Sequence, residues 1–140
     1  MTTATLPCPV VLTRPRADAA PWQQALTAAG FDTLSLPLIA IEAINSVSGV
    51  QRIAHTWAAM PSFAALMFVS ANAAQHWCAA GGDHVEAWLA AMQSHGYTGP
   101  RCWAPGPGTA AALQGLGVPP QYIDQPTHDA AQFDSEALWA

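Results

Sequence analysis

Residues 10–37, VVLTRPRADAAPWQQALTAAGFDTLSLP, carry the clearest structural pattern in the chain. The apolar run 10–13 is typical of a strand buried on both faces. From 18 to 29 apolar residues recur at helical spacing, and Gly30 supplies a C-terminal stop. Residues 33–36 form a second short apolar run that Pro37 closes. The order strand, helix, strand predicts a βαβ unit with two parallel strands joined by a right-handed crossover.

A faint repeat of this pattern lies in residues 101–126, RCWAPGPGTAAALQGLGVPPQYIDQP. We expect a strand at 101–104, a helix at 108–113 and a strand at 122–124. Strand, proline-bearing turn, alanine-rich helix, glycine stop and strand follow in the same order as before. Two copies of one supersecondary unit would explain the repeat, although many α/β proteins show as much.

The segments between and after these two regions complete an α/β pattern. We expect a Rossmann-like or flavodoxin-like protein with parallel sheets. The six tryptophans are interpreted mainly as core residues. The expected elements are an extended apolar segment at 38–44, weak helix at 51–59, a strand at 63–69, a helix from 70–72 through Trp77, a helix at 85–92 and a helix starting at 133–139.

Composition narrows the classes of function. The chain has 140 residues, a formal charge of −5 and four arginines with no lysine, so no basic patch exists for nucleic acid. No apolar run approaches the roughly 20 residues of a membrane helix, and the N-terminus lacks the pattern of a secretory signal. Three scattered cysteines fit a reducing compartment better than a disulfide framework. We therefore expect a cytoplasmic protein.

Candidate binding residues follow the predicted strands, because open parallel sheets bind ligands at the carboxyl ends of their strands. Each of these turns leads into a helix, whose free N–H groups and dipole favour anions. Backbone amides can therefore bind an acidic ligand without lysine. The candidates are Thr13 and Arg14 in the first turn, Ser70, Ala71 and Asn72 in the second, and Gly106, Gly108 and Thr109 in the third.

Other chemistries fit these residues less well. Gly106-Pro107-Gly108 resembles the start of a dinucleotide-binding GxGxxG, but Ala111 replaces its third glycine, and a plain glycine-rich turn is the alternative. Ser70 has no GxSxG context and is better read as a helix cap than as a nucleophile. The spacing of His76, Cys78 and His84 matches no tetrahedral metal site, so no metal is expected.

Six short segments, taken in order, resemble the uroporphyrinogen-III synthase family. None is diagnostic alone, but the series and its spacing are fairly specific. They are VLTRPR (11–16), AAG (28–30), LPLIAIE (36–42), FVSANAA (68–74), GPGTAAAL (106–113) and FDSEAL (133–138).

The resemblance implies two Rossmann-like domains joined by a two-stranded linker, with the first domain discontinuous. Residues 1–37 would be the opening βαβ unit of domain 1, 38–46 a linker strand, and 47–140 the N-terminal part of domain 2. The match covers about the first half of the family's length, so we expect the C-terminal part to be missing.

The family's reaction would make the complete protein a hydro-lyase of heme biosynthesis. It closes hydroxymethylbilane into uroporphyrinogen III, with inversion of ring D and loss of water, and needs no cofactor. The eight candidate residues match the family's cleft-facing turns, which would bind the substrate's eight carboxylates. A family tyrosine proposed to assist loss of water falls beyond residue 140, so the catalytic residue is unknown and the fragment alone is expected to be inactive. The complete protein is expected to be a monomer without nucleic-acid or membrane partners.

The rival hypothesis is a small flavodoxin-like module that binds an anion, or a partner, without catalysis. The two hypotheses differ in one structural expectation. The module requires strands 10–13 and 63–69 to share one sheet, whereas the synthase requires two separate sheets.

Overall fold

A computed structural model describes residues 8–127 and Leu138 of the protein. The helix predicted to start at 133–139 therefore lies, apart from Leu138, outside the described residues. The chain divides into two compact units, Met1–Glu42 and Ala43–Ala140, which are treated separately below.

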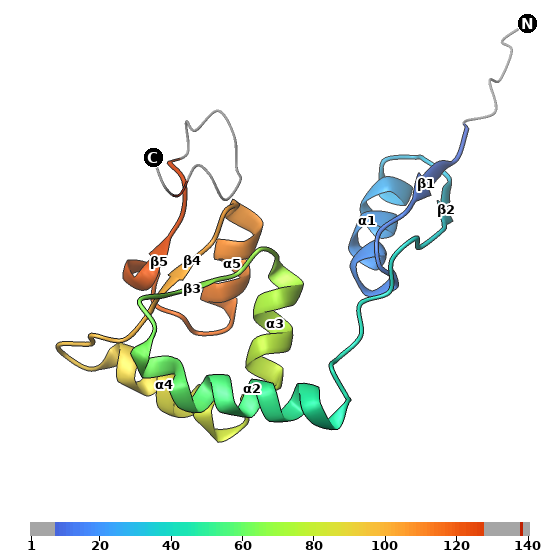
Figure 1. The fold of residues 1–140 in the computed structure, drawn as a ribbon. Helices are drawn as coiled ribbons and strands as arrows, with labels where there is room; N and C mark the ends of the chain where they lie inside the picture. The colour runs from blue at the N-terminus through green and yellow to red at the C-terminus, as the bar shows by residue number, and fades with distance from the viewer. Residues whose placement is uncertain (1–7, 128–137, 139–140) are drawn as a thin grey trace, which may run out of the picture. The chain divides into compact units, whose positions relative to one another are not determined.

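Unit 1 is a single βαβ unit (Figure 1). Strand β1 (Val10–Leu12) pairs in parallel with β2 (Thr33–Ser35), and helix α1 (Arg16–Ala28) connects them. Its buried apolar residues are Leu12 and Ala19, whereas Trp22 of α1 is 51% exposed. The interpretation of the tryptophans as core residues is therefore wrong for Trp22. Two strands and one helix offer too little apolar surface to enclose so large a side chain.

Helix α1 begins at Arg16, two residues before the predicted start, and ends as the sequence predicts. Gly30 has φ +86°, which an L side chain rarely adopts. The Gly30 N–H bonds the Thr27 carbonyl and the Phe31 N–H bonds the Leu26 carbonyl, each at 3.0 Å. This is a Schellman motif, and it satisfies two of the carbonyls that a helix end leaves free.

The segment 36–45 carries no helix or strand assignment. Its N–H groups continue the sheet for a short distance, since Leu36 bonds the Leu12 carbonyl and Leu38 bonds the Thr13 carbonyl. Leu38 is nevertheless 70% exposed, and Ile39, Ile41 and Ile44 are also exposed. No strand in the described residues pairs with this segment, so the linker strand stays a prediction.

None of the helices in the described ranges has the length and hydropathy needed to cross a membrane.

Unit 2 contains the larger sheet and the main core. Its elements are α2 (Val47–Ala59), η1 (Met60–Ser62), β3 (Ala65–Met67), α3 (Ala71–Ala79), α4 (Asp83–Gln93), β4 (Arg101–Trp103), α5 (Pro107–Gly115), η2 (Pro120–Tyr122) and β5 (Ile123–Asp124).

The three strands of unit 2 form one parallel sheet in the order β3-β4-β5. Ala65 pairs with Arg101 and Met67 with Trp103, while Trp103 pairs with Asp124 on the other side. Strand β1 pairs with β2 and belongs to a different sheet. The prediction of an α/β fold with parallel sheets is therefore confirmed, and the separation of β1 from β3 favours the synthase over the single-sheet module.

The core of unit 2 is rich in aromatic residues. Trp57 and Trp77 stack with ring centroids 4.4 Å apart and planes 14° apart, and Trp88 meets Trp57 edge-on at 5.7 Å. Trp88 donates to the Tyr97 hydroxyl, which donates to the Pro100 carbonyl. The indole N–H groups of Trp57 and Trp77 are buried and have no hydrogen-bond partner. The core interpretation holds for Trp57 and Trp88, which are both buried.

Helix α5 ends in the same way as α1, which gives the predicted repeat a structural counterpart. Gly117 has φ +96°, its N–H bonds the Gln114 carbonyl, and the Val118 N–H bonds the Leu113 carbonyl. Leu113 and Val118 are both buried, as the hydrophobic contact of a Schellman motif requires.

We expect Gly117→Ala to destabilise unit 2 by about 1 kcal/mol, since an L residue at this φ is strained. The added Cβ would also lie 3.3 Å from a methyl group of Leu89. Urea unfolding followed by far-UV circular dichroism measures the change. Gly115→Ala is the matched control, because Gly115 is the last helical residue of α5 and its added Cβ would meet no atom within 4 Å. Equal stability of the two variants would contradict the conclusion that the positive φ at residue 117 requires glycine.

Candidate functional site

Two of the three predicted turns lie at one edge of the unit 2 sheet. Strands β3 and β4 are parallel neighbours whose last paired residues are Met67 and Trp103. The Phe68 N–H then bonds the Trp103 carbonyl at 2.9 Å. Helices α3 and α5, which follow these strands, pack against each other (Figure 1). The β3–α3 and β4–α5 junctions are therefore adjacent.

The β3–α3 junction uses its serine as a helix cap. Ser70 has extended backbone angles, and its Oγ accepts a hydrogen bond from the Ala73 N–H at 3.1 Å. The Ala74 N–H bonds the Ser70 carbonyl. The interpretation of Ser70 as a cap is confirmed. Ala71 and Asn72 form the first turn of α3 and are half-buried.

The β4–α5 junction has no side-chain cap. Gly106 is the N-cap residue and Pro107, which has no N–H, is the first helical residue. The N–H groups of Thr109 and Ala110 both bond the Gly106 carbonyl, at 3.1 and 3.2 Å. Gly108 thus carries the first-turn amide for which the described residues provide no acceptor. Such an amide, at the positive end of the helix dipole, is suited to bind an anion.

The backbone of this junction faces open space. A Cβ added to Gly106 or Gly108 would have no heavy atom within 4 Å, whereas one added to Gly81 would meet Trp57 at 2.5 Å. Gly106 and Gly108 are therefore not required by packing within the described chain. Thr109 is 8% exposed and follows directly after the open amide.

The third predicted turn lies in unit 1. Thr13 and Arg14 are exposed at the carboxyl end of β1, and the Thr13 carbonyl accepts from the Leu38 N–H at 3.1 Å. The Arg14 guanidinium carbon lies 5.3 Å from the centre of the Trp22 ring, a cation–π contact. Part of the Trp22 ring is thus covered by Arg14. The structure thus brings together the predicted turns at Ser70 and at Gly106, which both belong to unit 2. The predicted turn at Thr13 belongs to unit 1.

A charged pair that sequence reasoning missed joins β4 to β5. Arg101 donates from Nε and Nη2 to the two carboxylate oxygens of Asp124, each at 2.7 Å, and from Nη2 to the Gln121 carbonyl at 2.9 Å. The Trp103 side chain also donates to Asp124. These hydrogen bonds, those of Arg101 first, hold the pKa of Asp124 below its ordinary value. The sequence gives only a weak signal for this ion pair, namely an arginine and an aspartate in the two predicted strands of the second repeat.

The two cysteines described in unit 2 have raised pKa values. Burial raises the pKa of the Cys102 thiol to about 12, so this group stays protonated at neutral pH. Burial also raises the pKa of Cys78. Within residues 8–127 and Leu138, no three His, Cys, Asp or Glu side chains are close enough to hold a metal ion.

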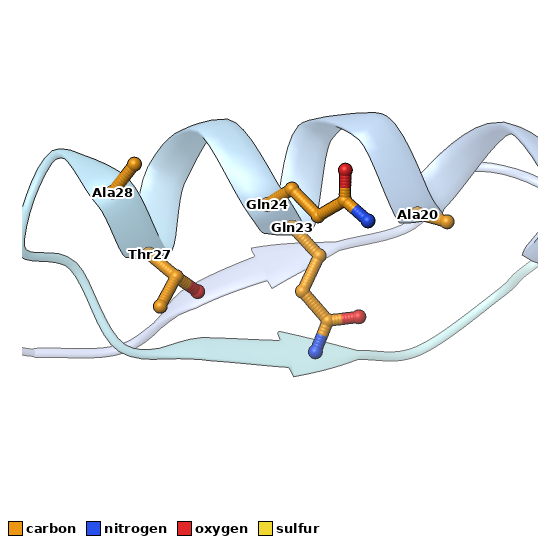
Figure 2. Close-up of a pocket in the computed structure, with 5 residues that line it drawn as sticks. All are labelled: Ala20, Gln23, Gln24, Thr27 and Ala28. Atoms are coloured by element: carbon orange, nitrogen blue, oxygen red, sulfur yellow. The ribbon is translucent and has the colours of Figure 1, made fainter.

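The described residues also line hollows away from these junctions. A cavity of about 540 Å³ is lined by residues of α2, α4 and the loop before β4, among them Trp57, Trp88 and Tyr97. It lies toward the amino ends of β3 and β4, away from the junctions. A second hollow is formed by one face of α1, where Ala20, Gln23, Gln24, Thr27 and Ala28 line it (Figure 2). A single helix face cannot enclose a ligand.

Fold and junctions together define an α/β protein with parallel sheets and a glycine-rich helix start at a strand end. The family model described as uroporphyrinogen-III synthase HemD matches residues 20–136. The chain belongs to this family, whose members function in tetrapyrrole biosynthesis. A search of curated proteins found no match.

Acid should remove the stabilisation that the Arg101–Asp124 pair provides. The pKa of Asp124 is lowered in the folded state, chiefly by its hydrogen bonds with Arg101. The ion pair therefore stabilises the fold fully at pH values above the pKa of Asp124 in the unfolded chain. This stabilisation is lost as the pH falls through the lower pKa of the folded state. Both side chains are over a third exposed. We therefore expect Asp124→Asn to cost only about 0.5–1 kcal/mol of unfolding free energy above about pH 5.

Urea unfolding of the wild type and Asp124→Asn at a series of pH values measures this difference. It should shrink toward zero as the medium becomes more acidic than the lowered pKa. A difference that stays constant into strong acid would show that the ion pair does not cause it.

Proposed function

We propose that this protein contributes the substrate-binding turns of a uroporphyrinogen-III synthase. The substrate would be hydroxymethylbilane, a linear tetrapyrrole with eight carboxylates, and the product uroporphyrinogen III. The observation that carries the proposal is the pair of adjacent helix starts on β3 and β4 in a chain whose family is the synthase family.

Anion binding by backbone amides suits this substrate. The open Gly108 amide and the start of α3 follow the neighbouring strands β4 and β3, so two carboxylate side chains of one ligand could reach them together. Glycine at 106 and 108 lets a carboxylate approach the backbone without meeting a side chain. Thr109, beside this amide, carries a hydroxyl that can serve as a further donor.

Catalysis in this proposal is chiefly a matter of positioning. Loss of the substrate's hydroxyl as water leaves an azafulvene-like cation, and attack by a carbon of the last ring gives a spiro intermediate that leads to the inverted product. The residues of this chain would hold the carboxylates so that this carbon, and not the competing one, meets the cation. Thr13 and Arg14 of unit 1 would bind further carboxylates of the same substrate.

The alternative of a non-catalytic anion-binding module receives less support. That module needs β1 and β3 in one sheet, and the described strands form two sheets. We therefore retain the synthase proposal.

We expect the 140-residue chain to bind the polycarboxylate without completing the reaction, since the resemblance assigns the family tyrosine proposed to assist loss of water to none of its residues. Hydroxymethylbilane is generated in the cuvette by hydroxymethylbilane synthase, and the products are oxidised and separated into isomers I and III. The chain alone should leave isomer I, the product of spontaneous closure. Isomer III above the enzyme-free background would contradict the expected inactivity.

Binding is tested at the open amide. Calorimetric titration with uroporphyrin, the stable oxidised octacarboxylate, should show about tenfold weaker binding for Gly108→Ala, equivalent to about 1.4 kcal/mol. The reason is that the added methyl group occupies the space through which a carboxylate approaches. Gly115→Ala makes the same change at the other end of α5 and should bind like the wild type.

Both alanines should leave the fold at least as stable as before, since neither Cβ meets an atom within 4 Å. A loss of affinity in Gly108→Ala therefore cannot come from unfolding. If the wild type does not bind uroporphyrin, the proposed function fails. If Gly108→Ala binds like Gly115→Ala, the assignment of the anion site to α5 fails.

A further inference from the structure

The cavity of about 540 Å³ in unit 2 lies between two helices and a loop. On α4 and its C-cap, Ala87, Ala91 and Ser94 follow one another at helical spacing and line it from one face of the helix. Pro61 of η1 lines it a few residues before β3, and residues 96–100 line it directly before β4. The cavity therefore lies at the opposite ends of these strands from the β3–α3 and β4–α5 junctions.

Small side chains leave this space unfilled. Where α2 and α4 line the cavity they carry alanines, namely Ala58, Ala87 and Ala91. All three are exposed, so the described part of the chain places no side chain over them. Close-packed protein interiors rarely leave a void larger than a water molecule. A hollow of this volume is instead the size of a site for a small molecule.

The buried part of the cavity wall is largely aromatic. Trp57 and Trp88 are 2% and 3% exposed. The Trp88 indole N–H donates to the Tyr97 hydroxyl at 3.2 Å, and this hydroxyl donates to the Pro100 carbonyl at 3.1 Å. A Cβ added to Gly99 would lie 2.5 Å from the Tyr97 hydroxyl, so glycine lets the loop lie against this ring. The wall is thus held by its own hydrogen bonds and offers a ligand mainly ring surface.

The lining of the cavity carries no fixed charge. None of the described residues that line it is Asp, Glu, Lys or Arg. Moving a charged group out of water without a partner is costly, so the lining disfavours acids and amines. The polar side chains of the lining, His84, Ser94 and Thr98, belong to exposed residues. One hydroxyl or carbonyl group of a ligand could therefore stay hydrated while its rings lie against the tryptophans.

We propose that this cavity binds a small, uncharged aromatic molecule. Its rings pack against Trp57, Trp88 and Tyr97, because aromatic surfaces attract one another in offset-stacked and edge-to-face arrangements. This inference goes beyond the proposed function and does not depend on it, since the anion-binding turns of that proposal follow the carboxyl ends of the strands.

The class of ligand is tested with 2-naphthol, an aromatic alcohol that is uncharged at neutral pH. The isotope-labelled 140-residue chain is titrated and followed by NMR. The indole N–H signals of Trp57 and Trp88 and the backbone signals of residues 96–99 should shift and saturate, whereas the Trp22 signal of unit 1 should not. The dissociation constant should be below about 1 mM, which is an ordinary affinity for a ligand of this size in a cavity.

Two matched probes separate charge from ring surface. The probe 2-naphthoate adds a negative charge, and decahydro-2-naphthol keeps the hydroxyl but has no aromatic ring. Each should bind at least about fivefold more weakly than 2-naphthol, the first because its charge finds no partner and the second because it loses the ring contacts.

Substitutions in α4 test the location. Ala91→Leu and Ala87→Leu each place a larger side chain in the cavity and should weaken 2-naphthol binding about tenfold, because the leucine takes space that the ligand needs. Ala90→Leu makes the same change in the same helix at an exposed alanine outside the lining, and should bind like the wild type. Leucine is a good helix former, and far-UV circular dichroism confirms that each variant is folded.

The outcomes decide this proposal separately from the proposed function. It is overturned if 2-naphthol gives no saturable shift in the wild type, or if Ala91→Leu and Ala87→Leu both bind like Ala90→Leu. Equal binding of 2-naphthoate overturns the uncharged class, and equal binding of decahydro-2-naphthol overturns the aromatic class. Titration with uroporphyrin reports on the start of α5, so its failure would leave this site standing.

Discussion

The parallel pairing of β3 with β4 is the constraint on which the candidate site depends. Because Met67 and Trp103 pair in register, the chain leaves both strands at the same level and enters α3 and α5 side by side. A shift of one residue would exchange the faces of Cys102 and Trp103, and so bury the wrong side chains. The junctions are thus set by the same apolar contacts that make the core, among them Phe68, Cys102 and Leu113.

The anion binding that we propose for these junctions would come from backbone geometry more than from charged side chains. Ser70 saturates one amide of α3, whereas α5 starts with residues that cannot cap it and leaves the Gly108 amide open. A chain with a formal charge of −5 and no lysine can therefore still accept carboxylates. Of the four arginines, Arg14 lies over the Trp22 ring and Arg101 forms an ion pair with Asp124.

Sequence reasoning predicted the elements well where local signals are strong. The strands appear within one or two residues of their predicted bounds, and Gly30 ends its helix because positive φ is nearly a glycine property. Helix α2 starts four residues before its predicted start, because Ser46 caps it by accepting from the Gly49 N–H. Serine is a common N-cap residue, so the sequence does contain this signal. Ser46 closely follows the apolar segment 38–44, which predicts an extended structure and not a helix start.

Long-range features were not predictable in the same way. The Arg101–Asp124 pair joins residues 23 positions apart and depends on the strand order, which no local pattern specifies. The exposure of Trp22 reflects how little of unit 1 the two short strands can cover. The predicted turns at Ser70 and Gly106 are adjacent because their strands are neighbours, a fact of topology and not of spacing.

The stacked indoles of Trp57 and Trp77 can report the local unfolding of unit 2. Their N–H hydrogens are enclosed without an acceptor, so solvent deuterium can replace them only when the aromatic core separates. The half-exposed indole of Trp22 in unit 1 exchanges without any such event. The exchange rates of the Trp57 and Trp77 indole protons therefore report the opening of the unit 2 core, and the Trp22 proton serves as the exposed reference in the same chain.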